Sequence, residues 1–272
     1  MSRLIALLCL VALAGPGAAV AAPREVSIAG NTFTPRVLHV LAGDQVRWKN
    51  QSSAVHNVVG PTFSEELSIG EEWLNPDPFT ADVAYICSIH NAMQGAIAVH
   101  DVYLRPFAAA VLYGNAMSFS GLAPSGSAVQ IERFAAGSWS AVGQPVVATS
   151  LDAFSAPLKP AVPGTYRATA AAGTSPAITV AVKPRVALTK RRLPRKRTRV
   201  TVTASPNRAG AVAVLQRKKP AGWAAIASKR LGTSSKAAFV VRPPKGTWRV
   251  RAIVKASGGY AAGLSAVIAV KR

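Results

Sequence analysis

The sequence predicts an all-β protein made of three β-sandwich domains in series, preceded by a short leader. Three observations support this prediction. Apolar and polar residues alternate over short runs such as Arg199–Thr203 and Trp248–Val254, and Gly, Pro and Ser separate the runs. The roughly 250 residues after the leader exceed one small domain. Residues 102–272 also contain an internal repeat of about 85 residues, a length typical of one sandwich.

Residues 1–21 have the features of a secretory signal peptide. Arg3 provides a positive charge, residues 4–14 form an apolar run, and a Gly-Pro-Gly break follows it. Small residues precede a cleavage point that we place after Ala21 or Ala22. A membrane-spanning helix would need nearer 20 apolar residues without such a break, so we expect no transmembrane segment in the mature chain. The leader predicts a secreted, periplasmic or cell-surface protein of a bacterium.

The N-terminal and C-terminal parts of the remaining chain differ in net charge. Residues 22–100 carry four basic and eight acidic side chains, a net charge of −4 (4 − 8). Residues 184–272 carry 22 Lys and Arg and no Asp or Glu, which accounts for the whole positive excess of the protein, +21. Together with the repeat, this distribution predicts domains over 22–101, 102–183 and 184–272.

The repeat rests on three pairs of segments at offsets of 84, 82 and 90 residues. The pairs are Gly137–Trp139 with Ala221–Trp223, Gly164–Arg167 with Gly246–Arg249, and Ser175–Val180 with Ser265–Val270. These two units resemble the Ig-like β-sandwich modules of bacterial exported proteins, and the resemblance implies two Ig-like domains. We expect the aromatic residues of the signatures to pack the two cores: Trp139, Tyr166, Trp223 and Trp248.

Three potential metal ligands lie on one short loop of the first domain. Cys87, His90 and Met93 are three residues apart, between a strand predicted to end at Ile86 and another predicted over residues 96–99, with Gly95 available for the turn. This spacing lets all three side chains point into one cavity. A thiolate, a thioether and imidazoles favour copper, and a blue-copper centre uses one Cys, two His and a weak axial Met. His56 provides the second imidazole.

Other interpretations of Cys87 remain open. With Cys9 in the leader, Cys87 is the only cysteine of the mature chain, so it cannot form an internal disulfide. If Cys87 were simply a buried apolar residue, the regular spacing of His90 and Met93 after it would be a coincidence. A Cys-His nucleophile lacks a recognisable oxyanion hole or orienting acid. Zinc favours more thiolate or histidine and gains little from methionine. Copper is the metal that we expect.

The first domain resembles the cupredoxin family over residues 24–101. The resemblance rests on Asn31–Pro35, Val40–Asn50, His56–Val59 and the short, amicyanin-like loop from Cys87 to Val99. Ala81 and Val83 depart from the family, which often has Gly and an aromatic residue there; neither is a predicted ligand. The resemblance implies a Greek-key sandwich that holds one type 1 copper ion through His56, Cys87, His90 and Met93.

The resemblance also implies roles for residues around the metal. Asn57 follows the first histidine, and its backbone N–H is expected to bond the sulfur while its side chain ties the two ligand loops. His90 is expected to expose its ring edge and pass electrons. Four protein ligands leave no open position for a substrate, so we expect a one-electron carrier and not an enzyme. The alternative is a copper-binding cell-surface or cell-wall protein that serves storage, delivery or adhesion.

Charged segments indicate partners. The run Lys190–Arg199 has seven charges in ten residues and predicts either a solvated segment or attraction to an anionic cell-envelope polymer or lipid. No aromatic residues interleave it, so specific nucleic-acid binding is not expected. Acidic residues between the ligand segments predict either a solvated face or a surface that steers a basic redox protein partner or the chain's own basic domain; they are Glu65, Glu66, Glu71, Glu72 and Asp77. His39 and His100 are expected to be bystanders, His39 exposed and neither with a ligand-like neighbour.

Overall fold

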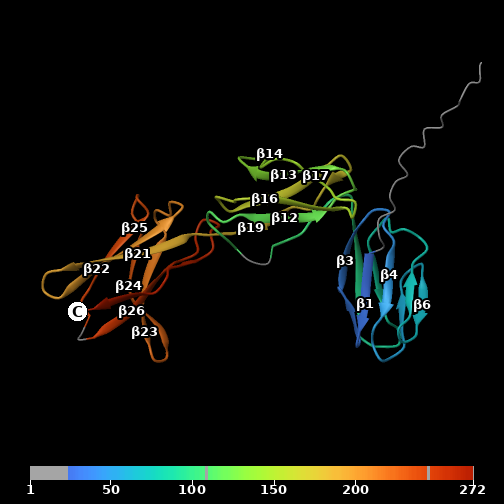
Figure 1. Ribbon diagram of the computed structural model, residues 1–272, viewed down its shortest axis with the longest axis horizontal. Coiled ribbons are helices and arrows are strands. Elements are labelled where there is room, and N and C mark those ends of the chain that lie inside the picture. The colour runs from blue at the N-terminus through green and yellow to red at the C-terminus, as the bar shows by residue number, and fades with distance from the viewer. Residues whose placement is uncertain (1–23, 108–109, 244–245, 272) are drawn as a thin grey trace, which may run out of the picture.

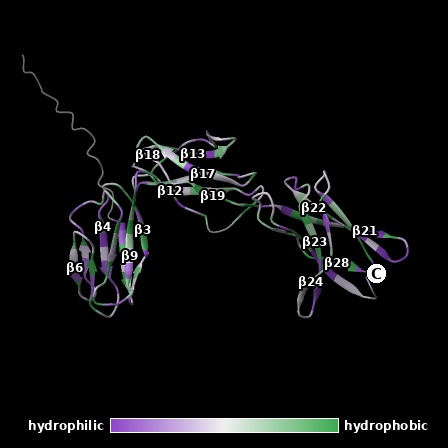
Figure 2. Cartoon of the chain, turned by 180° about the vertical axis from the view of Figure 1, so that it is seen from behind, coloured by the Kyte–Doolittle hydropathy of each residue, from purple (hydrophilic) through white to green (hydrophobic). Residues whose placement is uncertain are grey.

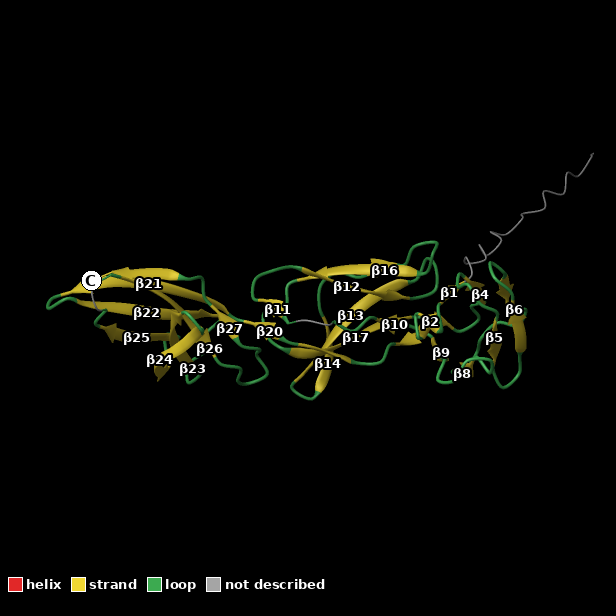
Figure 3. Ribbon diagram, turned by 90° about the horizontal axis from the view of Figure 1, so that it is seen from below, coloured by secondary structure: helices red, strands yellow, loops and turns green. Residues whose placement is uncertain are grey.

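The structure is a computed structural model that describes residues 24–107, 110–243 and 246–271 (Figure 1). The predicted signal peptide, with Cys9, lies outside these residues. The described chain contains strands, turns and loops, as Figure 3 shows, and no helix, so the all-β prediction is confirmed. Within the same residues there is no helix that could cross a membrane. Three sandwiches follow one another along the long axis of the molecule (Figure 1).

The N-terminal sandwich contains two sheets. The first has the order β2-β1-β4-β7 and the second β3-β9-β8-β5-β6. The strands of the first sheet are β1 (Arg24–Ala29), β2 (Thr32–Thr34), β4 (Val46–Asn50) and β7 (Glu72–Leu74). Those of the second are β3 (Val37–Leu41), β5 (His56–Val59), β6 (Ser64–Leu67), β8 (Val83–Ile86) and β9 (Gln94–His100). The pairs β1-β4 and β3-β9 are parallel, whereas the other ladders are antiparallel.

Alternation along these strands builds the core between the sheets. In β4, Val46, Trp48 and Asn50 are buried and the two residues between them are half-buried, as expected for a period of two residues. Trp48 is completely buried and its ring lies 5.2–6.2 Å from four other aromatic rings. Figure 2 shows the same alternation as hydrophobic and hydrophilic bands along the strands. The sandwich therefore has its own apolar core, which supports the loop that carries the predicted ligands.

The middle sandwich also consists of two main sheets. One has the order β10-β12-β16, and the other is built on β14-β13-β17-β18 with β15 and β19 attached. Its strands are β10 (Tyr103–Leu104), β11 (Val111–Leu112), β12 (Met117–Leu122), β13 (Ala128–Ala135), β14 (Ser138–Ala141), β15 (Val146–Val147), β16 (Ala153–Leu158), β17 (Gly164–Ala170), β18 (Gly173–Thr174), β19 (Ile178–Val180) and β20 (Val182–Lys183). The short strands β11 and β20 pair in parallel.

The C-terminal sandwich repeats this arrangement. Its sheets have the orders β21-β22-β25 and β24-β23-β26-β27, with β28 attached to β26. The strands are β21 (Arg185–Leu193), β22 (Arg197–Ser205), β23 (Val212–Lys219), β24 (Gly222–Arg230), β25 (Lys236–Val241), β26 (Thr247–Val254), β27 (Gly263–Leu264) and β28 (Ile268–Lys271). The cross-strand pair Glu132–Arg167 recurs as Gln216–Arg251, each residue displaced by 84 positions (216 − 132 and 251 − 167).

The signature aromatic residues do not all pack the cores. Tyr166 is buried in the middle core, and Trp248 lies partly buried against the C-terminal core. Trp139 and Trp223, by contrast, are half-buried and belong to neither core, which corrects the expectation. Each lies beneath an arginine: the guanidinium carbon of Arg167 is 4.3 Å from the Trp139 ring centroid, and that of Arg251 is 4.3 Å from the Trp223 centroid. Cation–π contacts on a sheet face thus hold both tryptophans.

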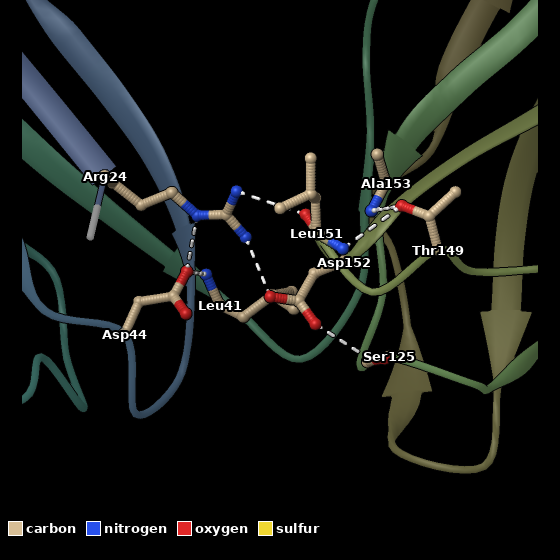
Figure 4. Close-up of polar contacts among 8 residues, drawn as sticks. All are labelled: Arg24, Leu41, Asp44, Ser125, Thr149, Leu151, Asp152 and Ala153. Atoms are coloured by element: carbon tan, nitrogen blue, oxygen red, sulfur yellow. Dashed lines mark hydrogen bonds and ion pairs between the residues drawn. The ribbon is translucent and has the colours of Figure 1, made fainter. Parts of the chain in front are cut away.

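Arg24 joins the N-terminal and middle sandwiches (Figure 4). Its Nε donates to Asp44 Oδ2 at 2.9 Å within its own sandwich, and its Nη2 donates to Asp152 Oδ2 at 3.1 Å in the middle one. Asp152 is held in turn, because its Oδ1 accepts a hydrogen bond from the Ser125 backbone N–H at 2.8 Å. The three charged side chains are 19%, 11% and 8% exposed, so water screens the ion pairs only weakly.

A double-mutant cycle on Arg24 and Asp152 is expected to give a coupling energy of about 1–2 kcal/mol, because charge-assisted hydrogen bonds away from water are worth about that much. Urea unfolding of Arg24→Ala, Asp152→Ala and the double variant measures it. The exposed pair Lys49–Glu72 is the control and should give a clearly smaller coupling energy, because water screens an exposed ion pair. Equal coupling energies for the two pairs would contradict a bridging role for Arg24.

Candidate metal centre

The second sheet brings together three of the four predicted ligands. Cys87 follows β8, His90 lies in the loop between β8 and β9, and His56 opens β5, the strand beside β8. Cys87 Sγ is 3.7 Å from His56 Nδ1 and 3.5 Å from His90 Nδ1, and the potential ligand atoms of the three residues all lie within 4.8 Å of one another. Two segments about 30 residues apart in sequence therefore converge on one point.

Backbone hydrogen bonds close the ligand loop. The Cys87 N–H donates to the Met93 carbonyl at 3.0 Å, and the Met93 N–H donates to the His90 carbonyl at 3.3 Å. Ala92 adopts a left-handed conformation with φ of 66°, which turns the chain between these two bonds. Met93 is 3% exposed and lies in the same apolar cluster as Cys87, which is also 3% exposed. The Met93 thioether therefore lies on the side of the loop that faces the core.

Gly95 has a different role from the one that the sequence predicts. It lies within β9, opposite Tyr85 of β8, and not in the turn. A Cβ atom at this position would come within 2.4 Å of the Tyr85 ring. The missing side chain thus makes room for a buried tyrosine beneath the ligand loop, while Ala92 makes the turn.

Asn57 ties the two ligand segments together. Its backbone N–H lies 3.5 Å from Cys87 Sγ. Its side chain donates from Nδ2 to Ser88 Oγ at 2.8 Å, and its Oδ1 accepts from the Ser88 N–H at 2.7 Å. These contacts fix the residue after one candidate ligand, His56, to the residue after another, Cys87.

Asn50 holds the chain before His56, a role that the sequence did not reveal. Its side chain is completely buried at the end of β4. The Nδ2 atom donates to the carbonyls of Ala54 at 2.8 Å and Leu67 at 2.9 Å, and Oδ1 accepts from the N–H of Ser52 at 3.0 Å. One amide therefore shapes the loop that delivers His56. The available signal was an asparagine at the inward position of an alternating strand, where burial requires hydrogen-bond partners.

Burial prepares His56 to bind a metal. The residue is completely buried, which lowers its pKa below the ordinary value, and a charge on His90 lowers that pKa further. Both effects favour the neutral imidazole, the form that coordinates metals. His56 Nδ1 faces Cys87, while Nε2 is buried without a hydrogen-bond partner among the described residues. His90, in contrast, is only half-buried.

The spacing of the donor atoms fits a single ion. Metal–sulfur bonds of about 2.3 Å and metal–nitrogen bonds of about 2.0 Å place sulfur and nitrogen ~3.5–3.7 Å apart when the angle at the metal is roughly 110–120°. The observed separations of 3.5 and 3.7 Å are in this range. A thiol proton could bond only one of the two imidazoles. The donor set therefore fits a metal without rearrangement of the loop.

The other two histidines lie away from this cluster, but they are not bystanders. His39 is half-buried, and its Nδ1 lies 2.9 Å from His100 Nε2, so the expectation of an exposed His39 without such a neighbour is wrong. The parallel ladder β3-β9 brings the two strands together, a long-range pairing that local sequence does not reveal. Tyr103 stacks on His39 with ring centroids 4.0 Å apart. This cluster packs where the first sandwich meets the strand β10 of the second.

The His39–His100 pair is expected to make the copper-free protein less stable as the pH falls. Burial lowers the pKa of both histidines. The unfolded chain, with histidine pKa values near ~6.5, then binds more protons, so stability is full above about 6.5 and is lost as the pH falls towards the folded-state pKa. Calorimetry at about pH 7.5 and pH 5 should show this loss. The loss should be smaller in the variant His39→Gln/His100→Gln, with a remainder from His56; an unchanged loss would refute the assignment.

The acidic residues between the ligand segments divide into two groups. Glu72 pairs with Lys49, and also with Arg47 at 3.2 Å, so its charge is compensated. The Glu71 carboxylate accepts a hydrogen bond from the Ser68 N–H at 2.7 Å. The remaining members of the predicted cluster are exposed; they are Glu65, Glu66 and Asp77.

Comparison with solved structures finds proteins that are similar to the N-terminal part of the chain. No protein-family model and no curated protein matches the chain. A purple cupredoxin from Nitrosopumilus maritimus is 22% identical over 28% of this chain and 99% of its own, with a TM-score of 0.27. A reduced amicyanin variant is 25% identical over 32% of this chain and 92% of its own, with a TM-score of 0.27. A copper-containing nitrite reductase from Thermus scotoductus is 27% identical over 32% of this chain and 23% of its own, also with a TM-score of 0.27.

Each of these similarities covers under a third of the chain, and the TM-scores are too low to decide a function. The neighbours include both small copper proteins and an enzyme. The assignment of the metal and its role therefore rests on the donor atoms and their surroundings.

Proposed function

We propose that the N-terminal sandwich binds one copper ion of type 1 through His56, Cys87, His90 and Met93, and that the protein is a one-electron carrier. The observation that supports this proposal most is the approach of one thiol sulfur to the Nδ1 atoms of two imidazoles, at 3.7 and 3.5 Å. One thiolate, two imidazoles and a thioether form the donor set typical of blue copper. Copper, when bound, provides the exchange of a single electron between Cu(I) and Cu(II).

The chain itself would keep this exchange fast by holding its ligands still. Asn57 fastens the two ligand segments to each other, and Asn50 fixes the loop before His56. The backbone N–H of Asn57 points a positive dipole at the Cys87 sulfur, which tunes the potential by stabilising negative charge there. Little of the site can move when an electron arrives, so the reorganisation that slows transfer is small.

The two imidazoles differ in exposure, so electrons would enter and leave through the more exposed one. His56 is completely buried, whereas His90 is half-buried. Its neighbour Ile89 is 47% exposed, and Ile86 is 45% exposed at the end of β8. We propose that a redox protein partner docks over this apolar surface and exchanges electrons through the edge of the His90 ring. With four protein ligands no position remains for a substrate, and we propose a carrier and not an enzyme.

The domains and location follow as parts of the same proposal. Residues 1–21 would direct export from a bacterium, 22–101 would form the copper domain, and 102–183 and 184–272 would be Ig-like modules. Support for the Ig-like assignment comes from strand order. One sheet contains β10, β12 and β16 in the middle module and β21, β22 and β25 in the C-terminal module, and the other main strands of each module form the second sheet. Ig-type sandwiches divide their strands between two sheets in a similar way.

Reconstitution with Cu(II) tests the carrier against a storage protein. A carrier should take up one copper ion per chain, become intensely blue and show reversible one-electron voltammetry. Colourless uptake of copper, or uptake of several ions, would favour storage or delivery. Uptake with colour but without reversible electron exchange would contradict the carrier proposal and leave the ligand assignment standing.

A further inference from the structure

A basic hollow lies at one end of the C-terminal sandwich, beside the β21–β22 hairpin. Two adjoining cavities of about 170 and 220 Å³ share three lining residues: Arg192, Thr198 and Lys271. Lys190 and the buried Val270 also line the first cavity, and Leu193, Lys196 and Arg197 also line the second. The hollow is bounded by the edges of two sheets, since Lys190 of β21 donates from Nζ to the Ala269 carbonyl of β28 at 2.6 Å. Figure 2 shows hydrophilic and hydrophobic bands along this hairpin beside the C-terminus.

A threonine lies at the base of this hollow. The inward positions of β22 are Thr198, Val200, Val202 and Ala204, all buried, and only Thr198 carries a polar side chain. Thr198 is 3% exposed and lines both cavities, so it offers a hydroxyl to a group bound there. A hydroxyl can donate a hydrogen bond to an acceptor oxygen of such a group.

No acidic side chain is paired with the positive charge around the hollow among the residues that the structure describes. Residues 184–272 contain no acidic side chain, and none of the ion pairs among the described residues involves this sandwich. On the outer face of the hairpin, Arg191 of β21 lies directly opposite Arg199 of β22, and both are exposed. Like charges in opposite positions destabilise a sheet. An anion held along the hairpin would relieve this repulsion.

We propose that the hollow binds the phosphate groups of an anionic polymer, and that the outer face of the hairpin holds neighbouring phosphates of the same chain. Arginine and lysine around a hydroxyl donor match the several acceptor oxygens of a phosphate group. A polymer fits better than a lipid surface because membrane-binding faces combine cations with exposed apolar side chains. The residues that line the two cavities include no exposed large apolar side chain.

Binding of long-chain inorganic polyphosphate to the full chain tests this proposal, and titration calorimetry at several salt concentrations gives affinity and salt dependence. Arg192→Gln/Lys271→Gln should weaken binding about tenfold or more near 0.1 M salt and reduce the slope of log affinity against log salt by about one per cation removed. The control Lys219→Gln/Lys236→Gln removes two exposed cations elsewhere in the sandwich and should have a smaller effect.

Variants of Thr198 distinguish a specific phosphate site from non-specific attraction by net charge. Thr198→Val keeps the shape and charge of the hollow, so it should weaken binding about tenfold with no change in the salt slope, and Thr198→Ser should restore most of the affinity. Thermal unfolding of each variant checks that the sandwich remains folded.

Three outcomes would overturn the proposal. Equal losses of polyphosphate affinity in Arg192→Gln/Lys271→Gln and in the control Lys219→Gln/Lys236→Gln would mean that net charge alone attracts the polymer. Equal affinity of the wild type for a carboxylate polymer, polyglutamate, would exclude phosphate recognition. Binding to vesicles of phosphatidylglycerol and phosphatidylcholine, without binding to polyphosphate, would identify a membrane surface as the partner.

Discussion

Cys87→Ser is expected to abolish the intense blue colour of the copper-loaded protein and to lower its copper affinity more than about 100-fold. The colour of a blue-copper centre depends on the bond between copper and thiolate, and serine cannot provide that bond. The size of the loss follows from the ligand role, because even residues that only position ligands are worth about 10–100-fold in metal affinity. Absorption spectra and competition with a copper chelator measure the two effects.

The variant His39→Gln/His100→Gln is the matched control for this experiment. It removes two imidazoles from the same sandwich, yet both lie outside the His56–Cys87–His90 cluster. Colour and copper affinity should stay as in the wild type. If Cys87→Ser keeps its spectrum, or if the control loses it, the metal is bound elsewhere.

Asn50→Ala is expected to destabilise the N-terminal sandwich by about 3 kcal/mol. The substitution removes a completely buried amide and its hydrogen bonds to the carbonyls of Ala54 and Leu67 and to the Ser52 N–H. Each unsatisfied buried group costs about 1–3 kcal/mol, and relaxation of the loop recovers part of the sum. Urea unfolding of the copper-free protein measures the change.

Ser52→Ala provides the comparison for Asn50. The Ser52 hydroxyl donates to Asn50 Oδ1 at 2.8 Å and also bonds the Ala54 carbonyl at 3.1 Å and the Ala54 N–H at 3.2 Å. Its removal leaves the three Asn50 bonds described above intact and should cost less, about 1–2 kcal/mol. The copper affinity should fall further in Asn50→Ala than in Ser52→Ala, because the first variant releases the loop that delivers His56. A loss of stability below about 1 kcal/mol in Asn50→Ala would show that the loop is held by other contacts.

The alternation of apolar and polar residues was sufficient to predict the all-β class, and the spacing of the donor residues to predict much of the candidate site. Cys87, His90 and Met93 lie on a loop between two strands, as their spacing and the alternation around them indicate. The position of His56 depends on the pairing of β5 with β8, which the sequence alone does not specify. Donor chemistry identified it: a blue-copper donor set needs a second imidazole, and His56 was available.

Features that depend on strand register were not predictable in the same way. Gly95 is opposite Tyr85 only because β8 and β9 pair in one register, and a glycine near a loop otherwise suggests a turn. His39 meets His100 across a parallel ladder, and the two histidines are 61 residues apart in the sequence. Trp139 and Trp223 were expected in cores because tryptophan is large and apolar. Arginines two strands away in the same sheet cover their rings instead, and both tryptophans are half-buried.

X-ray absorption at the copper edge of the loaded protein tests the central proposal most directly. One sulfur at a short distance and two imidazole nitrogens at about 2.0 Å are the predicted ligands, given that Cys87 Sγ already lies within 3.7 Å of both His56 and His90 Nδ1. A copper environment of nitrogen and oxygen alone, with no short sulfur bond, would contradict it.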